Sequence, residues 1–318
     1  MSPALLAERL AEGPRGQPWR IVITGSSGWI GRNAIDLLHQ ALGAEEFSRR
    51  VHLFGSVRRQ LAAGPHLVVQ HPLSEIAKLD RRPTLMLHLA FLTKDRADVM
   101  DEAAYVAANE ALRHQVSSNL DPIGVERLFV ASSGAALQAD NSAAAAAMQL
   151  YGALKKADED SFASWAEERG KRAVICRIFS LTGPHMNKPE AYALAAFILQ
   201  ALAGEPVLVK ASRPVFRSYV PASELVALML ALLLEQDGGV VRCESGGVPL
   251  EMADIAGEVA EQLGTSVTRP VFDPSAAPDR YVGNDHVYRA MLDEHGITQA
   301  TFADQVAETI KYLRHVNR

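Results

Sequence analysis

Residues 21–32 read IVITGSSGWIGR, an apolar β-branched run followed by a loop with three glycines. Gly25, Gly28 and Gly31 are spaced three residues apart, which is close to the G-x-G-x-x-G spacing of dinucleotide-binding loops but differs from it. Such a turn between a strand and a helix lets a pyrophosphate approach backbone N–H groups, and the helix N-terminus favours negative charge. Taken alone, the loop fits either a phosphate site or a tight turn without a ligand.

The residues that follow alternate between apolar strand patterns and helical periodicity. Strands are predicted at 20–24, 51–55, 66–70, 85–91, 127–133 and 172–179, and helices at 30–42, 101–119 and 150–169. Strands that alternate with helices favour right-handed crossovers and a parallel sheet. The sequence therefore predicts an α/β fold with a doubly wound parallel sheet of the Rossmann type.

Beyond residue 180 the strands shorten and prolines punctuate the loops. Helices are predicted there at 190–203, 222–235, 250–263 and 298–316, with a strand at 239–243. We expect an N-terminal extension at 1–18 that begins as a short amphipathic helix, a dinucleotide-binding domain at 19–180 and a smaller C-terminal substrate-binding lobe at 181–318. The last boundary is approximate, and the chain can cross it again.

Composition limits the classes of partner and site. The chain has 318 residues and a net charge of −5, which gives no general attraction to nucleic acid. Cys176 and Cys243 lie in apolar segments and are expected to be buried thiols, and no Cys/His cluster has zinc spacing, so no metal site is predicted. The longest apolar run, 225–234, is shorter than the roughly 20 residues that span a bilayer. We expect a soluble cytoplasmic protein that binds neither membranes nor nucleic acid.

Several short motifs occur in a fixed order along the chain. TGSSGWIG at 24–31 matches the TGxxGxxG signature of the short-chain dehydrogenase/reductase superfamily, and HLAF at 88–91 resembles its H-L-A-A segment. ASSGAA at 131–136, YGALK at 151–155, RIFSLTGP at 177–184 and RSYVPASEL at 217–225 resemble further motifs of the extended branch. Over about residues 20–295 the chain therefore resembles the NAD(P)-dependent epimerase/dehydratase family of extended short-chain dehydrogenases.

The resemblance implies Ser133, Tyr151 and Lys155 as catalytic residues. Tyr151 and Lys155 are four residues apart, so on a helix they share one face. A free tyrosine has a pKa near 10, and a neighbouring ammonium lowers that pKa by favouring the phenolate. Tyr151 can then exchange a proton with a substrate oxygen while Ser133 holds that oxygen and the nicotinamide exchanges a hydride.

The resemblance also implies a set of cofactor-binding residues: Gly25, Ser27, Gly28, Trp29, Ile30, Gly31, Arg32, Ser56, Arg58, Leu89, Ala90, Asn109, Tyr151 and Lys155. Gly55 and Ser56 end the second predicted strand, where an acid would bind the ribose of NAD. Because the acid is missing, Arg58 and Arg59 follow these positions and Arg32 follows the last glycine of the loop, NADP(H) is favoured over NAD. Asn109 is interpreted equally well as a structural amide that bonds the main chain near the site or as an ordinary, satisfied helix asparagine.

Departures from the family pattern narrow the reaction. Gly134 and Ala135 stand where sugar-nucleotide dehydratases carry Asp-Glu, so dehydration is disfavoured. Ser180 stands where the family carries Asn, and Ser218 and Glu224 stand where it carries Asp. The substrate contacts that the family makes through those positions are therefore not carried over to this chain.

The substrate is expected to bind through arginine as well as Ser133. Arg217 and Arg280 resemble arginines near the diphosphate of sugar-nucleotide substrates, for which the guanidinium fork is suited.

These patterns favour an NADP(H)-dependent oxidoreductase that acts on a nucleotide sugar, most simply by reduction of a 4-keto sugar. A nucleotide-sugar 4-epimerase with retained NAD, a reductase of non-sugar carbonyls and a non-catalytic dinucleotide sensor or scaffold are the alternatives. By the same resemblance we expect a homodimer, and Ala103, Val106, Ala107 and Leu154 fit either an interface or the core.

Overall fold

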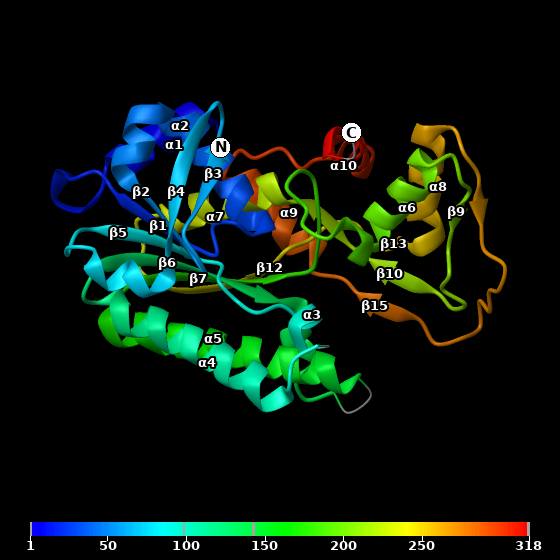
Figure 1. Ribbon diagram of the computed structural model, residues 1–318, viewed down its shortest axis with the longest axis horizontal. Helices are drawn as coiled ribbons and strands as arrows, with labels where there is room; N and C mark the ends of the chain where they lie inside the picture. Colours follow the sequence, from blue (N-terminus) through cyan, green and yellow to red (C-terminus); the bar gives the residue numbers. More distant parts are fainter. Residues whose placement is uncertain (1, 98, 142–143, 317–318) are drawn as a thin grey trace. The chain divides into compact units, whose positions relative to one another are not determined.

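The structure is a computed structural model that describes residues 2–97, 99–141 and 144–316 (Figure 1). Its contacts divide the chain into two compact units. Unit 1 comprises Met1–Ile178 and Val226–Glu244, and unit 2 comprises Phe179–Leu225 and Ser245–Arg318. The boundary predicted at residue 180 is approximate and allows the chain to cross it again; here the chain returns to unit 1 between 226 and 244.

Unit 1 is built on an eight-stranded sheet with the strand order β12-β7-β6-β5-β1-β2-β4-β3. The strands are β1 (Arg20–Thr24), β2 (Val51–Gly55), β3 (Arg59–Ala63), β4 (His66–Pro72), β5 (Thr84–His88), β6 (Val125–Ser133), β7 (Arg172–Ile178) and β12 (Gly239–Glu244). All neighbouring strands pair in parallel except β3 and β4. The predicted doubly wound parallel sheet is therefore confirmed.

Helices cover both faces of this sheet. Unit 1 contains α1 (Pro3–Ala11), α2 (Trp29–Arg50), α3 (Lys94–Ala97), α4 (Glu102–Leu120), α5 (Ala146–Arg169) and most of α7 (Ala222–Leu233), with short 3₁₀ turns η1 (Pro14–Gly16), η2 (Leu73–Lys78) and η3 (Gly134–Gln138). Figure 1 shows α4 and α5 side by side along one face and α2 along the other. Because both faces are covered, β1 is buried along its whole length.

Two local features differ from the sequence prediction. α2 extends to Arg50, but Gly43 interrupts it with a positive φ of 72°, so its first segment ends where the predicted helix ends. β3 is absent from the predicted strands, and it joins β4 in an antiparallel hairpin around Gly64. Its mostly exposed residues carry little apolar signal, because an edge strand contacts the sheet on one side only.

The N-terminal extension is part of unit 1. α1 buries Leu6 and Leu10 and packs against α2. The Arg50 guanidinium donates to the Trp19 carbonyl at 3.0 Å and also to the Leu10 carbonyl, which ties the extension to the end of α2.

Unit 2 consists of short strands and four further helices. Its strands are β8 (Ser180–Thr182), β9 (Val207–Leu208), β10 (Val215–Arg217), β11 (Tyr219–Pro221), β13 (Leu250–Glu251), β14 (Val267–Thr268) and β15 (Asp279–Tyr281). Its α-helices are α6 (Ala193–Leu202), α8 (Met252–Leu263), α9 (Asp285–Glu294) and α10 (Phe302–Val316), and a short 3₁₀ turn, η4 (Pro189–Ala191), precedes α6. The sequence did not predict α9, and α10 begins four residues later than predicted.

In unit 2, β10 pairs with β15 in parallel and with β13 in the antiparallel sense, and α6 packs beside α8. Across the described residues, every helix is too short or too polar to cross a membrane.

Candidate active site

The glycine loop between β1 and α2 is held against β5 by close backbone contact. Gly25 has a φ of +70°, and a Cβ on it would lie 2.7 Å from the Leu89 carbonyl carbon. A Cβ on Gly31 would lie 2.6 Å from the Gly25 carbonyl oxygen. Both positions therefore require glycine, which brings the N-terminus of α2 directly over the loop.

The end of β5 is fixed to the end of β1 by Thr24. Its hydroxyl accepts the Leu89 and Ala90 N–H groups at 3.2 and 3.3 Å and bonds His88 Nδ1 at 2.8 Å. Burial, and secondarily the Lys155 charge, lower the pKa of His88 to about 3. His88 is therefore a neutral packing residue, and its ring lies 4.9 Å from that of Phe162.

A glutamine fills the place of the missing acid at the end of β2. The side chain of Gln70 lies against Gly55, where a Cβ would come within 2.4 Å of its amide nitrogen. Gln70 accepts from the Ser26 hydroxyl at 2.8 Å and donates to the Val57 carbonyl at 2.8 Å. The sequence analysis did not single out Gln70, because its contact with Gly55 crosses between strands.

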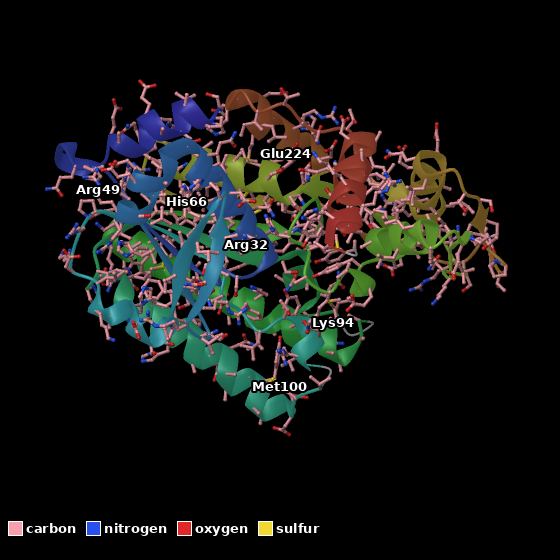
Figure 2. The ribbon with its side chains drawn as sticks, turned by 45° about the horizontal axis from the view of Figure 1, so that its top comes forward. Arg32, Arg49, His66, Lys94, Met100 and Glu224 are labelled. Atoms are coloured by element: carbon pink, nitrogen blue, oxygen red, sulfur yellow. The ribbon has the colours of Figure 1, made fainter. Side chains whose placement is uncertain are left out.

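The arginines of the predicted cofactor site have different surroundings. Arg58 is 56% exposed, bonds His71 Nδ1 at 3.1 Å and pairs with Glu75 at 3.5 Å. Arg32 is half-buried on the first turn of α2 (Figure 2), and Ser56 and Arg59 are exposed. Around them, Trp29 is buried, while Ser27, Gly28 and Ile30 are half-buried. Glu75 partly neutralises Arg58, which was not anticipated from the sequence.

Asn109 acts on the main chain beside the loop that follows β5. Its Oδ1 accepts the Leu92 N–H at 2.9 Å, and its Nδ2 donates to the Tyr105 carbonyl at 3.3 Å. The Tyr105 hydroxyl donates to the Leu92 carbonyl at 2.7 Å. These bonds match the interpretation of Asn109 as a structural amide, and they anchor residue 92 on both sides.

The three predicted catalytic residues lie on β6 and α5. Ser133 ends β6, and its hydroxyl accepts the Ala135 N–H at 3.2 Å. Lys155 is 6% exposed and donates to the Ala131 carbonyl at 2.8 Å. A Cβ on Gly152 would lie 2.2 Å from the Ala135 carbonyl oxygen, so the turn of α5 after Tyr151 packs on the segment after Ser133. The structure thus brings α5 directly against the end of β6.

Burial shifts the ionisation of the lysine. It lowers the pKa of Lys155 to about 8, while the carboxylates of Asp158 and Glu159 act in the opposite direction. A lysine with this pKa remains largely charged at neutral pH.

A buried glutamate ties together the elements beneath these residues. Glu159 on α5 is 2% exposed and accepts the Ser132 hydroxyl at 2.5 Å. It also receives two bonds from the Arg177 guanidinium, at 2.9 and 2.8 Å, and Arg242 lies 3.7 Å away. α5, β6, β7 and β12 are therefore linked next to Ser133 through one carboxylate.

Phe91 is a further residue of the site. Its ring centre lies 3.7 Å from Lys155 Nζ and 5.6 Å from the Tyr151 ring centre. The sequence showed it only as a departure from H-L-A-A, and nothing local indicated that it reaches α5.

The two predicted substrate arginines lie on neighbouring strands of unit 2. Arg217 on β10 pairs with Asp279 at 3.2 Å, and the exposed Arg280 on β15 lies over the Phe216 ring at 4.6 Å. Across the two strands, Arg280 is paired with Phe216 and not with Arg217, which is the next residue along β10. Successive side chains of a strand alternate between faces, so the two arginines extend from opposite faces of the small sheet.

Two residues that depart from the family pattern, Ser218 and Glu224, make structural contacts within unit 2. Ser218 is fully buried, and its hydroxyl accepts the Gly283 N–H at 3.1 Å. Glu224 (labelled in Figure 2) accepts the Tyr288 hydroxyl at 3.1 Å and the Ala300 N–H at 2.7 Å. Burial raises the pKa of Glu224 despite these bonds, and the residue anchors α9 and the loop before α10.

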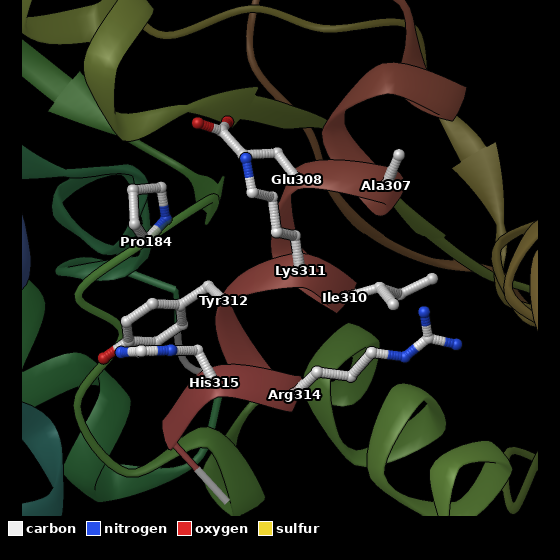
Figure 3. Close-up of a pocket in the computed structure, with 8 residues that line it drawn as sticks. All are labelled: Pro184, Ala307, Glu308, Ile310, Lys311, Tyr312, Arg314 and His315. Atoms are coloured by element: carbon white, nitrogen blue, oxygen red, sulfur yellow. The ribbon is translucent and has the colours of Figure 1, made fainter. Parts of the chain in front are cut away.

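Unit 2 also contains a cavity of about 590 Å³ along one face of α10 (Figure 3). Pro184 and α10 residues line it, and Lys311 extends alongside Glu308. None of the predicted site residues is among its lining residues.

Comparison with known proteins gives a family match and several solved structures with a similar fold. Residues 21–242 match the NAD dependent epimerase/dehydratase family. UDP-glucuronic acid decarboxylase 5 of Arabidopsis thaliana is 28% identical over 117 residues, which are 37% of this chain and 34% of the relative. The match thus spans about a third of the length of the curated relatives.

Solved structures resemble the whole fold. An epimerase from the methanogen Methanothermobacter thermautotrophicus superposes with a TM-score of 0.73 at 18% identity, over 99% of this chain and 97% of that one. MoeE5 in complex with UDP-glucose and NAD gives 0.72 at 19% identity, over 94% and 100%. The dTDP-glucose 4,6-dehydratase DesIV of Streptomyces venezuelae, with NAD bound, gives 0.69 at 19% identity, over 93% and 97%. At these identities the likeness concerns the fold.

Proposed function

Because this chain belongs to the NAD dependent epimerase/dehydratase family, we propose that it transfers a hydride between a nicotinamide cofactor and a sugar carbon of a nucleotide sugar. The observation that carries the proposal is the packing of Gly152 on the segment after Ser133, with Lys155 buried one turn further along α5. This arrangement presents a tyrosine, a lysine and a serine hydroxyl at the end of one parallel strand.

The loop between β1 and α2 fits the pyrophosphate of such a cofactor. No side chain caps α2 at Gly28, so its first N–H groups lack the cap that serine or aspartate would provide. A pyrophosphate oxygen is a suitable acceptor for them, and the helix N-terminus favours its charge. When bound there, a nicotinamide cofactor supplies or accepts the hydride.

The residues of the chain then handle the proton. Tyr151 donates its phenolic proton to the carbonyl oxygen in reduction and accepts a proton from the hydroxyl in oxidation. Lys155 stabilises the phenolate through its charge, and Ser133 orients the substrate oxygen. With Gly134 and Ala135 after Ser133, these positions offer no acid–base pair for elimination of water, which favours 4-keto reduction over dehydration.

NADP(H) is the proposed cofactor. Gly55 and Ser56 stand where an acid would bind the ribose, and the Gln70 side chain lies beside Gly55. Arg32 and Arg58 supply positive charge for a 2′-phosphate.

A 4-epimerase with retained NAD is the second candidate. The Arg58–Glu75 pair favours it, because a carboxylate 3.5 Å from Arg58 weakens attraction for a 2′-phosphate.

The proposed substrate contacts are Ser133 and one of the two arginines, Arg217 or Arg280. Because Arg217 and Arg280 extend from opposite faces of the small sheet, we expect only one of the two alanine variants to raise KM more than about tenfold.

A homodimer remains part of the proposal. Ala103 and Ala107 are exposed on α4 and Val106 is half-buried, whereas Leu154 is buried within the chain. An interface would therefore use α4 in preference to Leu154. Sedimentation at several protein concentrations tests it.

The function is tested by incubating the protein with UDP- and dTDP-linked 4-keto sugars and NADPH or NADH, and with UDP-hexoses and NAD. Stoichiometric oxidation of NADPH supports the reductase, whereas exchange of hexose epimers without net cofactor turnover supports the epimerase. The Tyr151→Phe variant must lose at least about 100-fold in kcat. Unchanged activity in that variant would refute the role of Tyr151, and cofactor binding without any turnover would favour a sensor.

A further inference from the structure

The ring of Phe91 contacts both members of the Tyr151–Lys155 pair. Lys155 Nζ lies 3.7 Å from the ring centre, well within the range of a cation–π contact. The Tyr151 and Phe91 rings are 5.6 Å apart and meet edge to face at 78°. Phe91 lies in the connection between β5 and α3. A single aromatic side chain from outside α5 thus contacts both the lysine and the tyrosine.

Phe91 is held in place by the residues on either side of it. The Ala90 N–H donates to Thr24 Oγ1 at 3.3 Å, and the Leu92 N–H donates to Asn109 Oδ1 at 2.9 Å. The Tyr105 hydroxyl also donates to the Leu92 carbonyl, at 2.7 Å. The backbone therefore directs the ring toward α5.

The charged side chains near Lys155 are engaged with other partners, so the contact of its ammonium with the Phe91 ring is important. On α5, Asp158 and Glu159 are acidic neighbours whose charge favours the ammonium. Asp158 lies 3.4 Å from Arg113 of α4, and Glu159 is paired with Arg177 of β7, so both carboxylates are partly neutralised. From β5, His88 faces Lys155 in its neutral form. The ammonium directly contacts the Ala131 carbonyl and the Phe91 ring.

We propose that Phe91 is a positioning residue of the Tyr151–Lys155 pair, whose π face holds the Lys155 ammonium beside Tyr151 and favours its charged form. The consequence for catalysis rests on the proposed function, but the effect on Lys155 itself does not. Removing the π face while keeping the apolar cover should make the ammonium easier to deprotonate.

The decisive test is a pH titration of the Lys155 side chain by NMR in protein labelled with ¹³C at lysine Cε. Lys155→Arg identifies the signal. Wild type should titrate at about 8, the value set mainly by burial. In Phe91→Leu the midpoint should fall by roughly one pH unit, because Leu has similar bulk without the π face. Phe91→Tyr retains an aromatic face and should titrate as wild type does.

Phe272→Leu is the matched control, because it removes a ring that lies 3.8 Å from Arg269 in unit 2 and should leave Lys155 unchanged. An unchanged midpoint in Phe91→Leu would overturn the proposal, as would an equal fall in Phe91→Tyr. If Phe91→Leu fails to fold, Phe91→Met provides the same comparison.

Kinetics extend the test to the reaction. The high-pH limb of kcat/KM for the cofactor reports groups of the free enzyme. It should move to lower pH in Phe91→Leu and stay in place in Phe91→Tyr. If no nucleotide sugar is turned over, the proposed function fails while the NMR titration still decides the role of Phe91.

Discussion

Gly152 lies against Ala135 so closely that a Cβ on the glycine would be 2.2 Å from the alanine carbonyl oxygen. Gly152 follows Tyr151 directly, and Ala135 is two residues beyond Ser133. The contact therefore sets the distance between α5, which bears Tyr151 and Lys155, and the strand that ends at Ser133.

Gly152→Ala is predicted to impair catalysis through this contact. The added methyl group must push α5 away from η3, and overpacking of this kind costs about 1–3 kcal/mol of stability. A shift of about 1 Å at Tyr151 is enough to lower kcat on the order of 100-fold. Turnover and thermal unfolding of the purified variant measure the two effects.

Gly257→Ala is the matched control for this prediction. Gly257 lies within α8, and a Cβ there meets no atom within 4 Å. The substitution should leave kcat unchanged and slightly stabilise the helix. Equal activity of the two variants would show that the contact at Gly152 does not position α5.

The burial of His88 predicts that the folded protein loses stability in mild acid. Burial lowers its pKa to about 3 in the folded protein, against 6.5 for the unfolded chain. The unfolded state therefore binds the proton first, and stability is lost as the pH falls from about 6.5 toward about 3. At about pH 5 the deficit is about 2 kcal/mol.

Urea unfolding at about pH 7 and about pH 5 measures the effect of His88. His88→Asn removes the titrating group, and its short amide remains a partner for Thr24. The wild type should lose about 2 kcal/mol more than this variant between the two pH values. Parallel losses in both proteins would contradict a neutral buried His88.

The parts of the fold that the sequence predicts are those governed by local periodicity. β1 and β5 contain continuous apolar runs because both of their faces are buried, and the glycine loop has a spacing that requires close backbone approach. The Tyr151–Lys155 spacing places both residues on one helix face from sequence alone.

The contacts that sequence patterns missed join residues distant in the chain. Gln70 meets Gly55 across two strands, and Phe91 meets Lys155 from a separate loop. Neither contact has a periodic signature, because each depends on the order of strands in the sheet. The opposite orientation of Arg217 and Arg280 likewise follows from the pairing of β10 with β15.

Glu75→Gln is predicted to increase affinity for NADPH relative to NADH. The Glu75 carboxylate lies 3.5 Å from Arg58 and 3.2 Å from His71 Nδ1, so it competes with a 2′-phosphate for the Arg58 guanidinium. Removing this one half-buried charge should improve NADPH binding roughly two- to fivefold and leave NADH binding unchanged. Fluorescence titration with both cofactors measures the ratio. Glu261→Gln, an exposed site in unit 2, changes the net charge equally and should have no effect. A gain for NADH equal to that for NADPH would place the Arg58–Glu75 pair outside the 2′-phosphate site.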